Sequence, residues 1–213
     1  MTGDKDDAEI RALQAQINPH FLFNTLNTLS TMALLEGAGK THQMLLSLSD
    51  LMRYSLRRSQ GLVTLEEETA HVKVYLQIQQ VTMGDRLKMR LDVPAELGGL
   101  GIPLLTLQPL VENAVIHGLE GKVEGGTVAI AGYLEEGGAV VEVRDDGCGM
   151  ESDLAERLLL GEIRPHTGHT AGLGLSNVHQ RLQYHFGPDF GLSLDSRPGR
   201  GTTVRVHLPA VNR

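Results

Sequence analysis

The spacing of apolar residues changes near Gly84, and this change divides the chain into two kinds of structure. Before Gly84, apolar residues recur every three or four positions, which is typical of amphipathic helices. After it, segments such as 87–93 alternate apolar and polar residues, which is typical of half-buried strands. A chain of 213 residues has room for a small helical module and one domain of ordinary size. We therefore expect an α+β protein in two parts.

The helical part predicts a hairpin. One helix is expected over residues 8–35 and a second over 42–58, with the glycine-containing turn 36–39 between them. Pro19 interrupts the first helix and predicts a kink just before His20, because proline removes one backbone hydrogen bond and clashes with the preceding turn. Two helices alone cannot bury both apolar stripes. We therefore expect a homodimer in which two hairpins form a four-helix bundle.

The remainder predicts a sandwich with helices on one face of a sheet. Thr64 and Glu67 have the spacing of a capping box, which predicts a helix that runs to about Met83. Strands are expected over 87–93, 127–133, 139–144, 190–195 and 202–208, and helices over 104–117 and 172–186. We expect three regions, namely the hairpin (1–62), a helical linker (63–86) and an α+β domain (87–213).

Composition excludes several classes of protein. Hydrophobic residues make up 41% and charged residues 21%, as in soluble globular proteins. The net charge of −7 and the lack of a basic cluster argue against direct nucleic-acid binding, so a phosphate-bearing ligand would need helix N-termini, backbone amides or Mg²⁺. Cys148 is the single cysteine, and no run approaches the ~20 apolar residues of a membrane span. We expect a cytoplasmic protein.

Two glycine-rich segments resemble nucleotide motifs and are rejected. Residues 37–41 resemble a P-loop, but Leu34 stands where the first glycine is needed and no strand is expected before it. Residues 172–174 begin like a dinucleotide fingerprint, but Asn177 stands at the third glycine position. Neither a P-loop nor a Rossmann domain is expected.

Four segments carry the candidate chemistry. They are Asn18-Pro19-His20-Phe21-Leu22-Phe23-Asn24, Glu112-Asn113-Ala114 with His117-Gly118, Asp145-Asp146-Gly147-Cys148-Gly149, and Gly172-Leu173-Gly174-Leu175 with Gly201-Thr202. Their order and content resemble the LytS-like sensor histidine kinases, whose ATP-binding part belongs to the GHKL superfamily with gyrase, Hsp90 and MutL. The resemblance covers residues 13–209 and implies the Bergerat α/β sandwich with a mixed sheet.

The resemblance also implies an activity and partners. ATP with Mg²⁺ would bind the α+β domain, the γ-phosphoryl group would pass to His20, and from there to an aspartate of a response regulator receiver domain. A regulator of the LytTR type is suggested by the family. A connection to a membrane would come only through a sensor that this chain does not contain.

Asn113, Glu112 and His117 are the first group of candidate site residues. A buried asparagine in an amphipathic helix is costly unless it binds something, and the resemblance gives Asn113 the role of Mg²⁺ ligand. Glu112 is a candidate base that could orient or deprotonate a water or the attacking imidazole, or else a helix acid favoured by the helix dipole. The resemblance assigns His117 to the nucleotide site.

Asp145 follows a strongly apolar strand and could accept a hydrogen bond from the adenine amino group. Gly147 and Gly149 would let the backbone approach the ring, although an ordinary Asp-Gly turn is the alternative. The resemblance implies that Thr202 helps to hold the adenine end. Asp146 stands where the family usually has Asn, which adds a negative charge near the nucleotide.

Gly172, Leu173 and Gly174 are expected to open a helix after the loose segment 151–171. A flexible segment that ends at a glycine-rich helix N-terminus suits a lid over phosphates. His166 and His169 lie in this segment and are expected to be solvated residues, not zinc ligands. Cys148 is expected to be a small side chain tolerated between two glycines.

His20 is the candidate phosphoacceptor, because a neutral imidazole can attack the γ-phosphorus of ATP. The alternative is a surface or core histidine. Phe21 stands where other histidine kinase classes have an acidic residue, so the proton acceptor is left open. Asn24, one turn later, could position a water for dephosphorylating a partner, or could cap or pack the helix.

Two other functions compete with the autokinase. One is a GHKL ATPase or protein serine kinase, and the other is a noncatalytic nucleotide-binding dimerisation module. Near Gln79 the family commonly continues with Arg-Phe, whereas this chain has Thr82-Met83 before Gly84.

Overall fold

The computed structural model describes residues 19–57, 61–162 and 171–210, with the backbone alone for 171–173. Contacts divide the chain into two compact units, Met1–Arg58 and Ser59–Arg213. Among the described residues, no helix is both long enough and apolar enough to cross a membrane.

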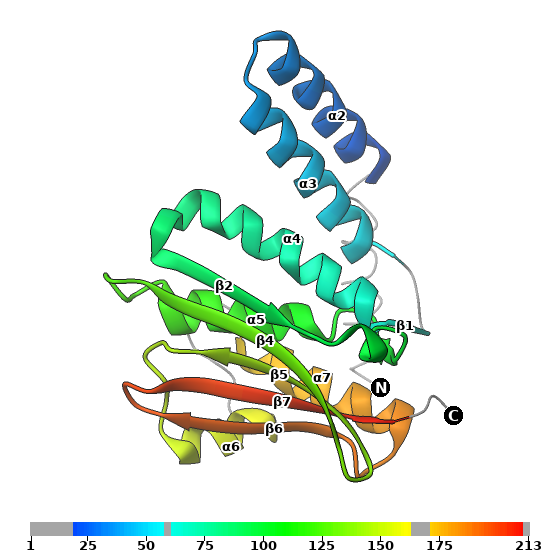
Figure 1. The fold of residues 1–213 in the computed structure, drawn as a ribbon, viewed down its shortest axis with the longest axis vertical. Coiled ribbons are helices and arrows are strands. Elements are labelled where there is room, and N and C mark those ends of the chain that lie inside the picture. Colours follow the sequence, from blue (N-terminus) through cyan, green and yellow to red (C-terminus); the bar gives the residue numbers. More distant parts are fainter. Residues whose placement is uncertain (1–18, 58–60, 163–170, 211–213) are drawn as a thin grey trace, which may run out of the picture. The chain divides into compact units, whose positions relative to one another are not determined.

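The first unit is the predicted helical hairpin (Figure 1). Helix α2 (Pro19–Leu35) begins at Pro19, where a missing N–H costs nothing, and α3 (Gly39–Ser55) follows the expected turn. Gly37 in this turn has a φ of 74°, which glycine adopts without strain. The predicted kink before His20 falls on residues 1–18, which lie outside the described residues.

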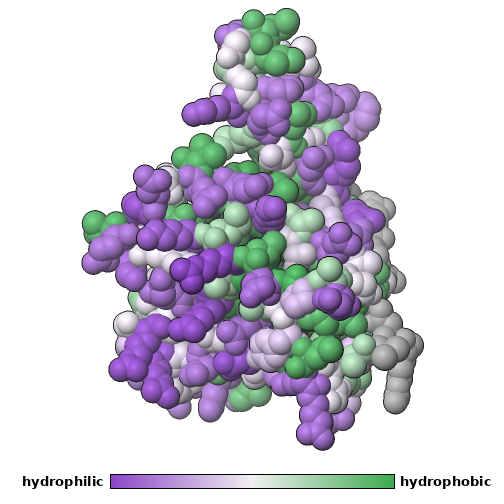
Figure 2. Space-filling model, viewed as in Figure 1, coloured by the Kyte–Doolittle hydropathy of each residue, from purple (hydrophilic) through white to green (hydrophobic). Residues whose placement is uncertain are grey.

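The hairpin buries little apolar surface on its own. Among the described residues of the hairpin, the buried ones are Leu26, Ser30, Ala33 and Ser49, and three of these four are small. Several large apolar side chains of α2 are exposed, with Leu35 the most exposed at 82%. Figure 2 shows apolar residues in green at the surface of this hairpin. A single copy therefore leaves much of its apolar surface in contact with water.

The second unit contains a five-stranded mixed sheet in the order β2-β4-β5-β7-β6 (Figure 1). Strands β2 and β4 pair in parallel, and the other neighbouring strands are antiparallel. The strands are β2 (Leu87–Asp92), β4 (Gly126–Glu135), β5 (Gly138–Asp145), β6 (Gly191–Arg197) and β7 (Gly201–Pro209). The predicted fold class is confirmed.

Helices cover one face of this sheet, and the core lies between the two layers. Alternation along the strands turns one set of side chains toward the helices. The largest helices of this unit are α4 (Leu65–Met83) and α7 (Ala171–Phe186). The buried strand residues of this face include Leu87, Val128, Ile130, Val141, Val143, Leu192, Val204, Val206 and Leu208. The buried helix residues include Val72, Leu76, Leu107, Leu110, Val111, Val178 and Leu182.

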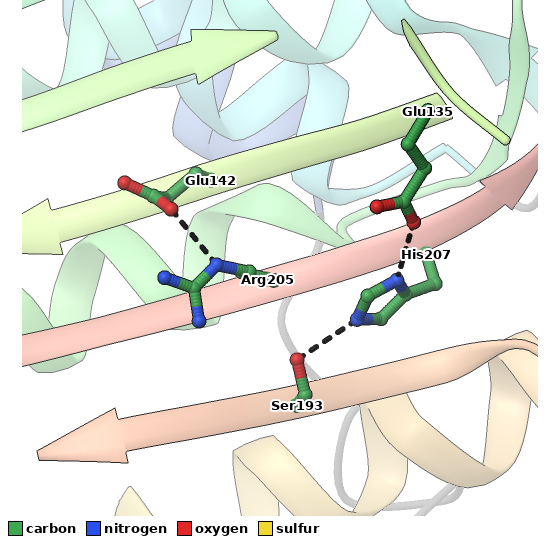
Figure 3. Close-up of polar contacts among 5 residues, drawn as sticks. All are labelled: Glu135, Glu142, Ser193, Arg205 and His207. Carbon is green, nitrogen blue, oxygen red and sulfur yellow. Dashed lines mark hydrogen bonds and ion pairs between the residues drawn. The ribbon is translucent and has the colours of Figure 1, made fainter. Parts of the chain in front are cut away.

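The other face of the sheet carries polar pairs between neighbouring strands (Figure 3). Arg205 on β7 donates through Nε to Glu142 on β5 at 3.0 Å. His207 Nδ1 lies 3.2 Å from Glu135 Oε1, and its Nε2 lies 2.8 Å from Ser193 Oγ. Such pairs are favourable across strands and match a face that meets water.

Helix α4 begins as its sequence predicts. Thr64 Oγ1 accepts from the Glu67 N–H at 3.2 Å, and Glu67 Oε2 accepts from the Thr64 N–H at 3.1 Å. The capping box is therefore complete. The helix ends at Met83 and is capped by Gly84, which has a φ of 59°.

Three parts of the second unit differ from expectation. Short strands β1 (Leu62–Thr64) and β3 (Gly101–Pro103) pair as a separate two-stranded sheet in segments for which no strand was predicted. Helix α6 (Ser152–Leu159) occupies part of the segment 151–171, so the expectation of a loose segment was wrong there. Its sequence has the helical spacing of Leu154, Ala155 and Leu158, and Ala155 is buried.

Candidate functional site

Asn113 lies where one kind of helix passes into another. Helix α5 (Leu107–Asn113) ends at this residue, and a π-helical segment, η3 (Ala114–Leu119), follows it. The expected helix 104–117 is thus interrupted, and such π-segments are frequent at functional sites. The buried Nδ2 atom of Asn113 has no hydrogen-bond partner among the described residues. A buried amide in this state favours a bound ligand.

Glu112 has a defined partner on its own helix. Gln108 Nε2 donates to Glu112 Oε1 at 2.7 Å, and Gln108 Oε1 lies 2.5 Å from His71 Nε2 on α4. The acid is therefore bound to a neighbour one turn away, which a favourable position in the helix dipole alone would not require.

The start of α5 is held by a carboxylate from α4. Glu68 is fully buried and accepts from the N–H groups of residues 105–107 at 2.7, 2.9 and 2.9 Å. Leu105 has a φ of 58°, which is unusual for a residue with a side chain. Arg181 Nη2 donates to the Leu105 carbonyl at 2.8 Å. These contacts fix the helix that carries Glu112 and Asn113.

Asp145 ends β5 and is almost fully buried. Its Oδ1 atom accepts from the Gly147 N–H at 2.9 Å. Burial raises the pKa of the Asp145 carboxyl to about 6, and the charge of Asp146 adds to the rise, while the backbone N–H groups of Gly147 and Thr202 act in the opposite direction. Asp145 is a buried acceptor whose charge can change near neutral pH.

The glycines around Asp145 are needed for close backbone packing. A Cβ at Gly147 would lie 2.2 Å from the Gly118 carbonyl oxygen, and one at Gly149 would lie 2.0 Å from the Arg197 carbonyl oxygen. A Cβ at Gly201 would lie 2.0 Å from the Asp145 carbonyl oxygen. The loop after β5 is therefore packed against the end of η3 and the start of β7.

His117 and Cys148 meet in this packing. His117 is exposed on η3, and its carbonyl oxygen accepts from Cys148 Sγ at 3.0 Å. The Cys148 N–H also donates to the Gly118 carbonyl at 3.1 Å. Cys148 is exposed and is more than a tolerated small residue, because its Sγ atom and its N–H group join the loop to η3.

Asp146 turns its carboxylate toward the backbone of the sheet. Its Oδ1 atom accepts from the Thr127 N–H at 2.7 Å, and its carbonyl oxygen accepts from Lys122 Nζ at 2.8 Å. The side chain thus has a structural partner at the start of β4. Its charge nevertheless acts on the neighbouring carboxyl, because it contributes to the raised pKa of Asp145.

Gly172, Leu173 and Gly174 lie in the first turn of α7, as expected. A Cβ at Gly174 would lie 3.4 Å from Pro109 Cβ, so the beginning of α7 packs beside the beginning of α5. His166 and His169 lie outside the described residues. Within the described part of the chain, no group of three or more His, Cys, Asp or Glu side chains could hold a metal ion.

His20 is exposed near the start of α2 in the first unit. Asn24 Nδ2 lies 3.2 Å from His20 Nδ1. The same Nδ2 atom lies 3.5 Å from His20 Nε2, so the Asn24 amide can donate to the imidazole ring. Asn24 is itself exposed, which makes helix packing a poor account of it.

Comparison with known proteins covers both units. A histidine kinase family model matches residues 8–87, and a model of the histidine kinase-, DNA gyrase B- and HSP90-like ATPases matches residues 103–212. The sensor histidine kinase BtsS of Escherichia coli K12 is 36% identical over 202 residues, which are 95% of this chain and 33% of that protein. The sensor protein LytS of Bacillus anthracis is 36% identical over 204 residues, which are 95% of this chain and 34% of that protein.

The chain belongs to the LytS-like histidine kinases. Its second unit belongs to the histidine kinase-, DNA gyrase B- and HSP90-like ATPases. The chain spans about a third of the length of the curated relatives that it matches.

Solved histidine kinases share the fold of this LytS-like chain. The catalytic domain of histidine kinase ThkA has a TM-score of 0.55 at 17% identity, and the match covers 71% of this chain and 96% of that domain. The mycobacterial sensor histidine kinase MprB has a TM-score of 0.52 at 18% identity, with 71% and 99% covered.

Sequence reasoning missed several residues that support this LytS-like site. Ser196 is buried, accepts from the Met150 N–H at 2.9 Å and lies 2.9 Å from Thr202 Oγ1. Nothing in its local sequence marks it. Gln108 could have been found, because it lies one helical turn before Glu112 on the same expected helix. Glu68 acts on a segment far along the chain, so spacing could not reveal it.

Proposed function

We propose that this chain is the kinase core of a two-component system, which phosphorylates itself on His20 with ATP and passes the phosphoryl group to an aspartate of a response regulator. The observation that carries the proposal is the match of residues 8–87, which include the exposed His20, to the histidine kinases. The ATPase family match of residues 103–212 supports ATP as the phosphoryl donor.

Asp145 and Thr202 would hold the adenine end of ATP. The carboxylate of Asp145 can accept from the adenine amino group, and the raised pKa is what burial without a ligand should cause. Thr202 is joined to Asp145 through its backbone and to Ser196 through its side chain. His117, Gly147 and Gly149 would complete this end of the site.

Asn113 and the start of α7 would hold the phosphates. The amide oxygen of Asn113 is a suitable Mg²⁺ ligand, and its unpartnered Nδ2 donor would bind an acceptor such as a phosphate oxygen. Mg²⁺ supplies positive charge that offsets the charge of the phosphates. Backbone N–H groups at Gly172, Leu173 and Gly174 open α7 and can bind phosphate oxygens without lysine.

The transfer converts His20 to phosphohistidine. A ring nitrogen forms a bond to the γ-phosphorus while the bond from that phosphorus to the bridging oxygen breaks, and ADP leaves with the electron pair. The ring proton must pass to a base, for which Glu112 is our candidate. Asn24 touches the His20 ring and is the candidate for positioning a water when the regulator is dephosphorylated.

The partners follow from the same proposal. The exposed apolar residues of α2 support a homodimer in which two hairpins bury them together. A receiver domain would then accept the phosphoryl group, and we propose a regulator of the LytTR type. Because ATP is a cytoplasmic nucleotide, the proposal places this chain in the cytoplasm, with any membrane connection through a sensor outside it.

Incubation with γ-³²P-ATP and Mg²⁺ tests the proposal. The wild type should acquire an acid-labile label that His20→Ala and Asn113→Ala abolish, while the control His185→Ala keeps it. Acid-stable label or free phosphate alone would instead favour a serine kinase or an ATPase. Nucleotide binding without label would favour a noncatalytic module.

A further inference from the structure

Three polar side chains lie one turn apart along one face of α4. Glu68, His71 and Tyr75 have the spacing of a single helix face, and all three are buried. Glu68 binds the N–H groups at the start of α5, and His71 contacts Gln108 within α5. The junction between α4 and α5 is therefore polar where an apolar contact would suffice for packing.

Tyr75, the third residue of this face, is affected by the charge of Glu112. Burial raises the pKa of Tyr75 to about 12, and the negative charge of Glu112 adds to the rise. An electrostatic effect of this kind requires the Glu112 carboxylate to be near α4. Glu112 is thus bound by its own helix and is close to the preceding helix as well.

Chemistry fixes the direction of the hydrogen bonds from His71 to Glu112. An ionised carboxylate only accepts, so Gln108 must present its NH₂ group to Glu112, as observed at 2.7 Å. Its carbonyl oxygen then faces His71 Nε2, which must carry a proton and donate. The opposite orientation of the amide would place two acceptors against each other.

We propose that His71 and Gln108 are positioning residues that hold the Glu112 carboxylate in one orientation for the phosphoryl transfer. This inference rests on the proposed function, because it supplies the support for the base named there. Gln108 carries the direct contact, and His71 fixes the amide of Gln108 from a second helix. The arrangement removes the rotational freedom that a half-exposed glutamate would otherwise have.

Substitutions of Gln108 separate orientation from packing. Gln108→Met keeps the volume but removes both polar groups, and Gln108→Glu keeps the size and an acceptor for His71 but replaces the donor that faces Glu112. Both should slow formation of acid-labile label about tenfold or more, while the affinity for ADP stays within about threefold. The matched control Gln183→Met, a half-buried glutamine on α7, should stay within about twofold of the wild type.

A double substitution tests whether Gln108 acts through Glu112. In a Glu112→Gln background, Gln108→Met should cause little further loss, because the two residues act as one unit. A wild-type rate for Gln108→Glu would overturn the proposal, since packing alone would then explain the residue. Fully multiplicative losses in the double variant would overturn it as well.

An activity-independent measurement distinguishes failure of this inference from failure of the proposed function. In ¹H–¹⁵N spectra, the Gln108 side-chain amide is identified by its loss in Gln108→Met, and it should shift in Glu112→Gln and in His71→Phe. It should not move in Gln183→Met. A Gln108 amide signal that does not shift in either variant would overturn the inference. A responsive signal in a protein that forms no phosphohistidine would support the contacts and count against the proposed function.

Discussion

Asp145 shows how burial prepares a residue for a ligand. The native environment favours the neutral carboxyl, because its pKa is raised to about 6 from an ordinary value of 3.8. Without nucleotide, the group therefore contributes stability at low pH that is lost as pH rises through about 6. A ligand that donates to the carboxylate would reverse this preference.

ATP affinity should weaken as pH falls below about 6, because protonation of Asp145 removes the acceptor for the adenine amino group. Asp145→Asn should weaken binding at pH 7.5 by about tenfold or more and remove this part of the pH dependence. Calorimetric titration between pH 5 and 8 measures both effects. A variant with the wild-type pH profile would assign the dependence to another group.

Gly147→Ala should destabilise the second unit by about 2 kcal/mol, because the added Cβ would lie 2.2 Å from the Gly118 carbonyl oxygen. Gly99→Ala is the matched control, since a Cβ there meets nothing within 4 Å. Urea denaturation of the two variants gives the comparison. Equal stabilities would show that the loop after β5 can shift to admit the methyl group.

At the scale of elements, α4 and α5 depend on each other. The N–H groups at the start of α5 have no partner within their own helix, and Glu68 supplies the acceptor from α4. Arg181 lies close enough for its pKa, which burial lowers, to be raised in part by the charge of Glu68. Helix α5 is thus anchored by two other helices.

Glu68→Gln should reduce the free energy of unfolding by about 3 kcal/mol, because one amide oxygen replaces a carboxylate that accepts three N–H groups. Glu66→Gln, an exposed change on the same turn, should cost less than about 0.5 kcal/mol. Denaturation in urea measures both. Similar losses for the two variants would mean that general charge, and not the three contacts, stabilises this region.

Local signals in the sequence predicted most of these elements. The capping box at Thr64 and the apolar alternation of β4 and β5 act over a few residues, so their structures followed from the sequence. Helix α6 was missed because Gly161, Pro165 and Gly168 were given more weight than the helical spacing of Leu154, Ala155 and Leu158. The roles of Glu68 and Ser196 were missed for another reason, since each binds residues that only the folded chain brings near.

At the scale of the whole molecule, the exposed apolar surface of α2 predicts self-association. Leu29→Glu should raise the dissociation constant of the dimer by about tenfold or more, because a charge would enter a buried contact. Leu134→Glu, at an exposed leucine of β4, should leave the mass unchanged. Light scattering at micromolar concentration decides, and a monomeric wild type would contradict the dimer.

The position of α4 determines where two such kinases can be joined in a chimaeric protein. This helix lies within residues 8–87, the match to the histidine kinase model, yet it belongs to the compact unit Ser59–Arg213 and holds the start of α5. A chimaera joined near residue 87 would combine Glu68 on α4 from one parent with the start of α5 from the other parent. A chimaera joined near residues 58–60 would take α4 and α5 from the same parent. Helix α4 should therefore be kept together with the ATPase part.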